Sequence, residues 1–165
     1  MTTLDPLTGP LVRLFLRIDA AQPTDPVLRA VSEFWQLNRT GKIAPSESEM
    51  KGFPIELSPY VFYAQMMSNG TKHWVASGAG HVAGSVLQLT GGDSPEVGDK
   101  RIAVRLRRLF DIVADKIEPY SAMFEIDGET GQRQLVEVFA APLSNGEKGI
   151  HMIFAAVNRR TEARQ

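Results

Sequence analysis

The residues of this chain best suited to bind a metal or a haem are its three histidines, His73, His81 and His151. An imidazole can take that role when it lines the wall of a pocket. His73 and His151 fall in predicted strands and are expected to face solvent, whereas His81 lies in a glycine-rich middle segment. The chain has no cysteine and no H-x-x-x-H or H-E-x-x-H spacing, which disfavours a metalloenzyme. We expect structural histidines, and the pattern identifies no cofactor.

Carboxylates form a second group, near a predicted hairpin: Glu125, Asp127, Glu129 and Glu137. A buried pair of them could do acid–base chemistry, but we expect these side chains to solvate a turn and an exposed strand face. The glycine-rich stretches fit neither a P-loop nor the dinucleotide fingerprint, and no serine has a G-x-S-x-G context. We therefore expect that the chain is not an enzyme.

Arginines form a third group. Arg101, Arg105 and Arg108 share one stripe of a predicted helix, at i, i+4 and i+7. The stripe could grip phosphate or an acidic partner, or it could be the solvated face of the helix. The formal net charge of −1 gives no bulk attraction to nucleic acid or to an anionic membrane. We expect a solvated face and no nucleic-acid partner.

Helices must position several of these residues. Asp25-Pro26 suits an N-cap followed by the first helical position. Residues 99–118 carry the clearest apolar stripe of the chain. Shorter helices are expected around 81–89 and from Ser46, where Glu49 would complete a capping box.

Strands account for much of the remaining chain. Residues 60–64 and 74–76 are rich in aromatic and β-branched side chains and flank Asn69-Gly70, which predicts a hairpin. Three more strands are expected at roughly 120–127, 134–143 and 149–157, the last two joined by a tight turn through Asn145-Gly146. The order predicts five antiparallel strands, with helices inserted between the second and the third.

A length of 165 residues suits one domain. We predict an N-terminal arm over 1–25, a domain over 26–158 and a flexible tail over 159–165. The arm contains an apolar patch over 11–18, which one helical turn would make amphipathic. It either packs on its own domain or makes a dimer contact.

The same composition bears on localisation. No run approaches the about 20 apolar residues of a membrane span, and the N-terminus lacks the basic region of a signal peptide. The absence of cysteine fits a reducing compartment. We expect a cytoplasmic protein with no membrane partner.

Three short motifs follow one another in a suggestive order. They are Phe34-Trp35-Gln36-Leu37-Asn38-Arg39 with Gly41 and Pro45, then Leu57-Ser58-Pro59-Tyr60-Val61, then Pro142-Leu143-Ser144-Asn145-Gly146. Together with the predicted order of helices and strands, they resemble the PAS superfamily, and most closely a bacterial subgroup, common in alphaproteobacteria, of short stand-alone PAS proteins. The resemblance covers about residues 26–157. Residues 74–81 depart from it, because an arginine-bearing strand and a Phe-Gly-Arg helix are missing there.

The resemblance implies an α+β fold: a PAS-like five-stranded antiparallel sheet with helices on one face and an N-terminal helical extension. It also implies that side chains from several elements converge on one cavity for a small apolar ligand, and that His81 lies where a haem ligand of such a domain could lie. The predicted ligand-binding residues are Trp74, His81, Phe110, Phe124, Met152 and Phe154. The alternative is that the aromatic and methionine side chains fill a packed core.

The resemblance further implies a sensory or protein-interaction role in bacterial signal transduction. A ligand or partner would shift the population of two arrangements by its differential affinity, and the output would pass through a signalling protein partner or a homodimer. One alternative is a small-ligand carrier or enzyme on a cone-shaped α+β scaffold, marked by a buried polar pair that includes His81. Another is an anion or nucleic-acid binder that uses the arginine stripe.

Overall fold

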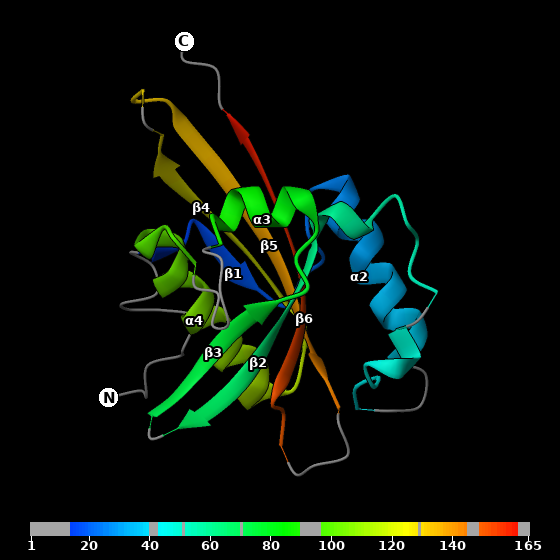
Figure 1. The fold of residues 1–165 in the computed structure, drawn as a ribbon. Coiled ribbons are helices and arrows are strands. Elements are labelled where there is room, and N and C mark those ends of the chain that lie inside the picture. The colour runs from blue at the N-terminus through cyan, green and yellow to red at the C-terminus, as the bar shows by residue number, and fades with distance from the viewer. Residues whose placement is uncertain are drawn as a thin grey trace, which may run out of the picture.

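The chain folds around one antiparallel sheet, as a computed structural model shows (Figure 1). The structure describes residues 14–39, 43–50, 52–69, 71–89, 97–128, 130–144 and 149–161. The strand order in the sheet is β1-β4-β5-β6-β2-β3. The strands are β1 (Arg17–Asp19), β2 (Val61–Asn69), β3 (Thr71–Ser77), β4 (Tyr120–Asp127), β5 (Arg133–Leu143) and β6 (Met152–Thr161).

Helices precede and interrupt the strands, largely where the sequence predicts them. They are α2 (Pro26–Arg39), η1 (Ser48–Met50), η2 (Ser58–Tyr60), α3 (His81–Leu87) and α4 (Lys100–Lys116). Asp25 caps α2, since its Oδ1 accepts hydrogen bonds from the amides of Val27 and Leu28. Asp99 caps α4 through the amide of Arg101.

The capping box before η1 is also confirmed. The Ser46 amide donates to Glu49 Oε1 at 2.9 Å, and the Glu49 amide donates to Ser46 Oγ at 3.3 Å.

The two faces of the sheet carry two separate cores, because successive residues of a strand point to opposite sides. Phe62 on β2 packs beneath α3 and α4, whereas its neighbour Val61 packs beneath α2. Figure 1 shows α4 on one side of the sheet and α2 on the other. The prediction of helices on one face is right for α3 and α4, but α2 covers the opposite face.

The helix α4 lies across the sheet and contacts β3, β4, β5 and β6. Its apolar stripe is buried at Ile102, Leu106, Leu109 and Val113. Ile117, which continues the spacing of this stripe, is the C-cap, in a left-handed conformation at φ 55°. The helix that carries the arginine stripe therefore covers one face of the sheet.

The N-terminal segment adds a sixth strand that the sequence did not predict. Arg17–Asp19 pairs antiparallel with β4, with Ile18 opposite Ala122. Phe15 and Ile18 are buried in the core beneath α4, so this part of the predicted arm packs on its own domain. At the other end, β6 continues to Thr161, beyond residue 158.

The predicted hairpins form, while their turns lie outside the described residues. β2 pairs antiparallel with β3 up to Asn69 opposite Thr71, and β5 pairs antiparallel with β6 along ten residue pairs. Gly70 and residues 145–148 are not among the described residues, nor are 1–13 and 162–165.

Candidate functional site

The six predicted ligand-binding residues do not converge on one cavity. Trp74, Phe110 and Phe124 belong to the core beneath α4, where Phe110 lies 5.8 Å from Trp74 and 6.1 Å from Phe62 between ring centroids. The indole of Trp74 donates a hydrogen bond of 2.9 Å to Asp111, which ties β3 to α4. Trp74 and Phe110 pack on each other, and Phe124 packs on Phe15 at 6.1 Å between centroids, so these side chains fill a core.

Met152 and Phe154 lie on the opposite face of the sheet, in the core beneath α2. Both belong to β6, two residues apart, so they share a face. β6 is buried from Ile153 to Val157 on both faces, and a strand of this kind shows no alternation from which the face could be read. The expectation that these side chains meet Phe110 and Phe124 is therefore wrong.

His81 begins α3 and is exposed, so it lines neither core. No group of three or more His, Asp or Glu side chains in the described ranges is placed to hold a metal ion. The buried polar or charged side chains in those ranges are Ser32, Ser121 and Glu137. The buried polar pair with His81 that would mark the carrier or enzyme alternative is therefore not formed by the described residues.

The arginine stripe is partly engaged within the chain. Arg105 Nε donates to the Leu14 carbonyl at 2.7 Å, and its guanidinium lies 5.2 Å from the Phe124 ring centroid. Arg101 bonds to Asp99 at 2.8 Å and to the Asp127 carbonyl at 3.0 Å. Burial lowers the pKa of Arg105, the larger effect, and the neighbouring charge of Arg101 adds to it. Two of the three stripe residues thus hold the N-terminal segment and the β4 end against α4.

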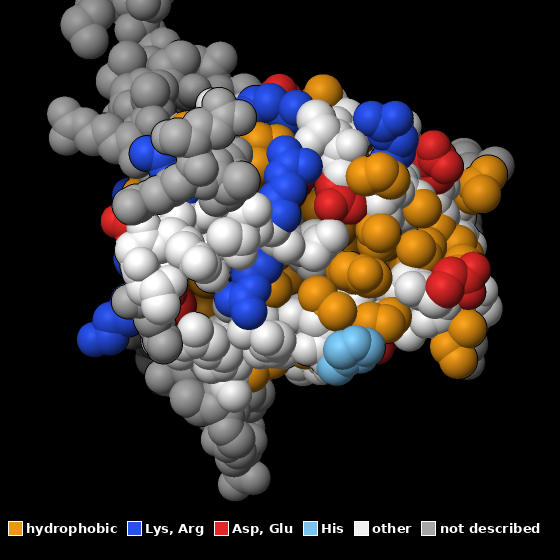
Figure 2. All heavy atoms as spheres, turned by 90° about the horizontal axis from the view of Figure 1, so that it is seen from above, with side chains coloured by type: hydrophobic (Ala, Val, Ile, Leu, Met, Phe, Trp, Pro, Cys, Tyr) orange, Lys and Arg blue, Asp and Glu red, His pale blue; other side chains and the backbone are white. Residues whose placement is uncertain are grey.

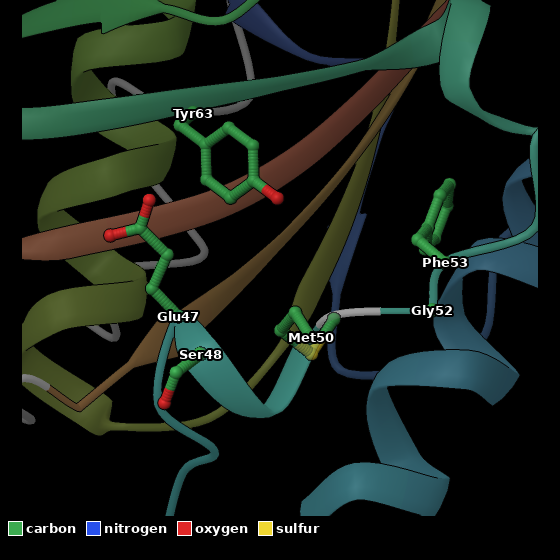
Figure 3. A pocket seen from close by; sticks show the side chains of 6 residues that line it. All are labelled: Glu47, Ser48, Met50, Gly52, Phe53 and Tyr63. Atoms are coloured by element: carbon green, nitrogen blue, oxygen red, sulfur yellow. The ribbon is translucent and has the colours of Figure 1, made fainter.

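A pocket of about 490 Å³ opens on the α2 side of the sheet (Figure 3). Such a volume suits a small molecule. The side chains of Tyr63 and Phe53 stand on opposite sides of the hollow in Figure 3, with Met50 between them and the Glu47 carboxylate beside Tyr63. The lining residues are Glu47, Ser48, Met50, Gly52, Phe53 and Tyr63.

The pocket is built by the short helical segment around η1 and by the strand β2. The capping box sets η1 and the residues around it, and Met50 anchors this segment because it is only 3% exposed. β2 supplies Tyr63, which points to the α2 face like Val61, two residues earlier. The pocket therefore lies between the η1 segment and the sheet.

Aromatic contacts hold two of the pocket walls in place. Phe53 packs edge-on against Phe34 at 4.9 Å and against Phe154 at 5.6 Å between centroids. Tyr63 packs on the same Phe154 ring at 5.7 Å. Phe154, one of the predicted ligand-binding residues, thus supports the pocket from behind without lining it.

The electrostatics of the pocket centre on Tyr63 and Glu47. Tyr63 is half-buried, and this burial raises the pKa of its phenol above the usual 10.0, with a further rise from the negative charge of Glu47. The phenol is therefore neutral at physiological pH. Glu47 is exposed at the pocket rim.

The sequence does not predict this pocket, although it predicts two of the features that build it. It predicts residues 60–64 as a strand, but it does not show that Phe62 and Tyr63 point to opposite faces of the sheet. The usable signal was the capping box at Ser46 followed by Phe53, since it predicts a tight turn that presents an aromatic side chain.

A second polar cluster joins the start of α2 to the sheet. Glu137 is 6% exposed, and its carboxylate accepts hydrogen bonds from the amides of Thr24 at 2.7 Å and Asp25 at 3.0 Å. Asp25 in turn accepts a bond of 2.9 Å from the Asn158 side chain. The cavity beside them, about 10 Å³, holds at most one water molecule. The prediction that Glu137 faces solvent is wrong, and its role is structural.

Exposed hydrophobic side chains gather on the same side of the molecule as α2 (Figures 1 and 2). We call α2 and the loop segments beside it the α2 layer. Among the described residues, three large hydrophobic side chains of this layer are exposed: Leu37 is 75% exposed, Ile43 68% and Ile55 82%. A surface of this kind can contact another protein.

Comparison with known proteins yields no match: neither a family model, nor a curated protein, nor a solved structure is similar to this chain. Within the described residues, no helix has the length and apolar character that a membrane crossing requires. The site must therefore be interpreted from its own geometry.

Proposed function

We propose that this chain is a PAS-like sensory module that binds a small ligand and passes the signal on through a protein partner or a second copy of itself. The observation that carries the proposal is the connectivity of the sheet. The β2–β3 hairpin is followed by α3 and α4, and then by β4, β5 and β6, the last of which returns to pair with β2. This is the element order on which the resemblance to PAS proteins rests.

The position of α4 supports a signalling role. It contacts both edges of this five-strand array, β3 through the Trp74–Asp111 bond and β4 through Arg101. A ligand that prefers one seating of α4 would shift the equilibrium by its differential affinity, and tenfold tighter binding to one seating corresponds to about 1.4 kcal/mol.

The exposed apolar side chains of the α2 layer support contact with a second copy. Leu37 and Ile55 are both mostly exposed, as is Leu16 at 60%, which precedes the edge strand β1. α2 covers the central strands β5 and β6, whereas β1 is an edge strand, so separate variants at the two places distinguish which surface self-associates.

The test combines ligand binding with mass in solution. The full chain is screened by thermal shift against a metabolite library, and light scattering then gives the mass with and without each stabilising compound. Leu37→Ser combined with Ile55→Ser should abolish association through the α2 layer, and Leu16→Ser should abolish association through the N-terminal segment.

A compound that stabilises the chain and changes its mass, or the exchange of α4 amides, is the expected result. Stabilising compounds that change neither would refute a sensory role. So would the absence of any stabilising compound together with a purely monomeric chain.

A further inference from the structure

The described lining of the α2-side pocket carries one sign of charge. Glu47 is its only ionised side chain. The other contacts open to a ligand come from the neutral Tyr63 phenol, the Phe53 ring and the Met50 thioether. The Ser48 hydroxyl shares a hydrogen bond of 3.0 Å with the Ser46 hydroxyl. A carboxylate beside aromatic faces attracts a cation that also has an apolar body.

The two aromatic walls are held before any ligand arrives. Phe53 and Tyr63 both rest on the fully buried Phe154 ring, at 5.6 Å and 5.7 Å between centroids. Because Phe154 belongs to the central strand β6, neither wall moves without disturbing the core beneath α2. Walls held in this way lose little conformational entropy when a ligand binds between them.

We propose that this pocket binds a small organic cation, a protonated primary amine that carries an aromatic or similarly apolar group. The ammonium lies at Glu47, beside the Tyr63 ring, and the apolar group packs between Tyr63, Phe53 and Met50. The binding claim stands on this geometry, and only its signalling consequence rests on the proposed sensory function.

The charge of Glu47 already acts on this site within the protein. It contributes to the raised pKa of the Tyr63 phenol, so its field reaches the ring. Because the phenol stays neutral, the Glu47 carboxylate is the one charge that a ligand meets in the described lining.

Four probes that differ in one property each test the proposal: 2-phenylethylamine, 2-phenylethanol, 3-phenylpropanoate and methylamine. Binding to the full chain is followed by amide chemical shifts at pH 7 and low salt. Two unit charges about 4 Å apart in a wet site interact by about 1 kcal/mol, or about fivefold in affinity. We expect 2-phenylethylamine to bind about fivefold tighter than the neutral alcohol, the acid to bind more weakly still, and methylamine to show no shifts.

Variants assign the effect to residues. Glu47→Gln should remove the fivefold preference for the amine, and Tyr63→Leu should weaken binding of the amine and the alcohol alike. Glu56→Gln, which removes an exposed carboxylate outside the lining, is the control and should change nothing.

Equal binding of the amine and the alcohol, tighter binding of the acid, or no shifts at Tyr63 and Phe53 in folded protein would each overturn the proposal. None of these results bears on the sensory proposal, which is tested by changes in the mass of the protein in solution and in the exchange of α4 amides. Conversely, an amine that binds as expected but leaves mass and α4 unchanged supports the site and counts against the signalling role.

Discussion

Replacement of Glu137 by alanine tests how the first turn of α2 is held on the sheet. The carboxylate is 6% exposed and accepts from three donors: the Thr24 amide at 2.7 Å, the Thr24 hydroxyl at 2.9 Å and the Asp25 amide at 3.0 Å. Thr24 itself is exposed, so water can replace part of what is lost. At about 1 kcal/mol net for each bond, Glu137→Ala should lower the free energy of unfolding by about 3 kcal/mol. Glu137→Gln should cost about half as much, because one carbonyl oxygen remains to accept.

Urea denaturation measures this loss of unfolding free energy, and the m-value should stay unchanged if the folded and unfolded states keep the same compactness. Amide exchange at Thr24 and Asp25 should accelerate in the alanine variant, since these two donors are released. The control is Glu125→Ala, which breaks a pair with Arg133 at 3.0 Å whose side chains are 29% and 61% exposed. That surface pair should contribute less than about 1 kcal/mol. A loss for Glu137→Ala no greater than for this control would refute the argument that the carboxylate holds α2.

Three further predictions concern close approach, pH and a buried donor. Gly80→Ala should destabilise the protein strongly because the new Cβ would clash with the backbone oxygen of Ser58 in η2. Gly84→Ala, whose Cβ would have nothing within 4 Å, should stabilise α3 by up to about 1 kcal/mol, and urea denaturation measures both effects. The hydrogen bond and charge of Arg101 lower the pKa of Asp99, so the Asp99→Asn variant should be less stable than the parent protein at pH 7. The difference in unfolding free energy should vanish as the pH falls from about 4 through the lowered pKa, and a difference that persists in acid would contradict this. Trp35→Phe should lower the free energy of unfolding by about 2–3 kcal/mol, measured by thermal unfolding. The fully buried indole donates a hydrogen bond of 3.0 Å to a β5 carbonyl, which would be left unsatisfied. A loss under about 1 kcal/mol would show that water replaces the donor.

Local signals predicted the elements well because each depends on a few neighbouring residues. Asp25 and Asp99 begin helices since a carboxylate accepts from amides two or three positions ahead. Residues 120–127 were predicted and observed as the same strand, and the 81–89 helix differs only by its end at Leu87. These features hold whatever the rest of the chain does.

The faces of the strands could not be predicted because both sides of the sheet are buried. β5 is buried without interruption from Leu135 to Leu143, so its sequence shows no alternation of polar and apolar side chains. For the same reason Phe154 and Phe124 looked equivalent, although one packs beneath α2 and the other beneath α4.

The sequence by itself determined where helices and strands begin, the antiparallel hairpins and the apolar stripe of α4, because these depend on propensity, capping and turn chemistry over short distances. The tertiary structure alone decided the sixth strand, the buried carboxylate of Glu137 and the pocket between η1 and β2. The sixth strand and the buried carboxylate join segments distant in the chain: Arg17 meets Ser121 across 104 positions, and Glu137 meets Thr24 across 113. The pocket depends on Phe154 of β6, which supports both Phe53 and Tyr63. Such contacts form only when the whole core closes, since the packing of both sheet faces sets which side chains meet.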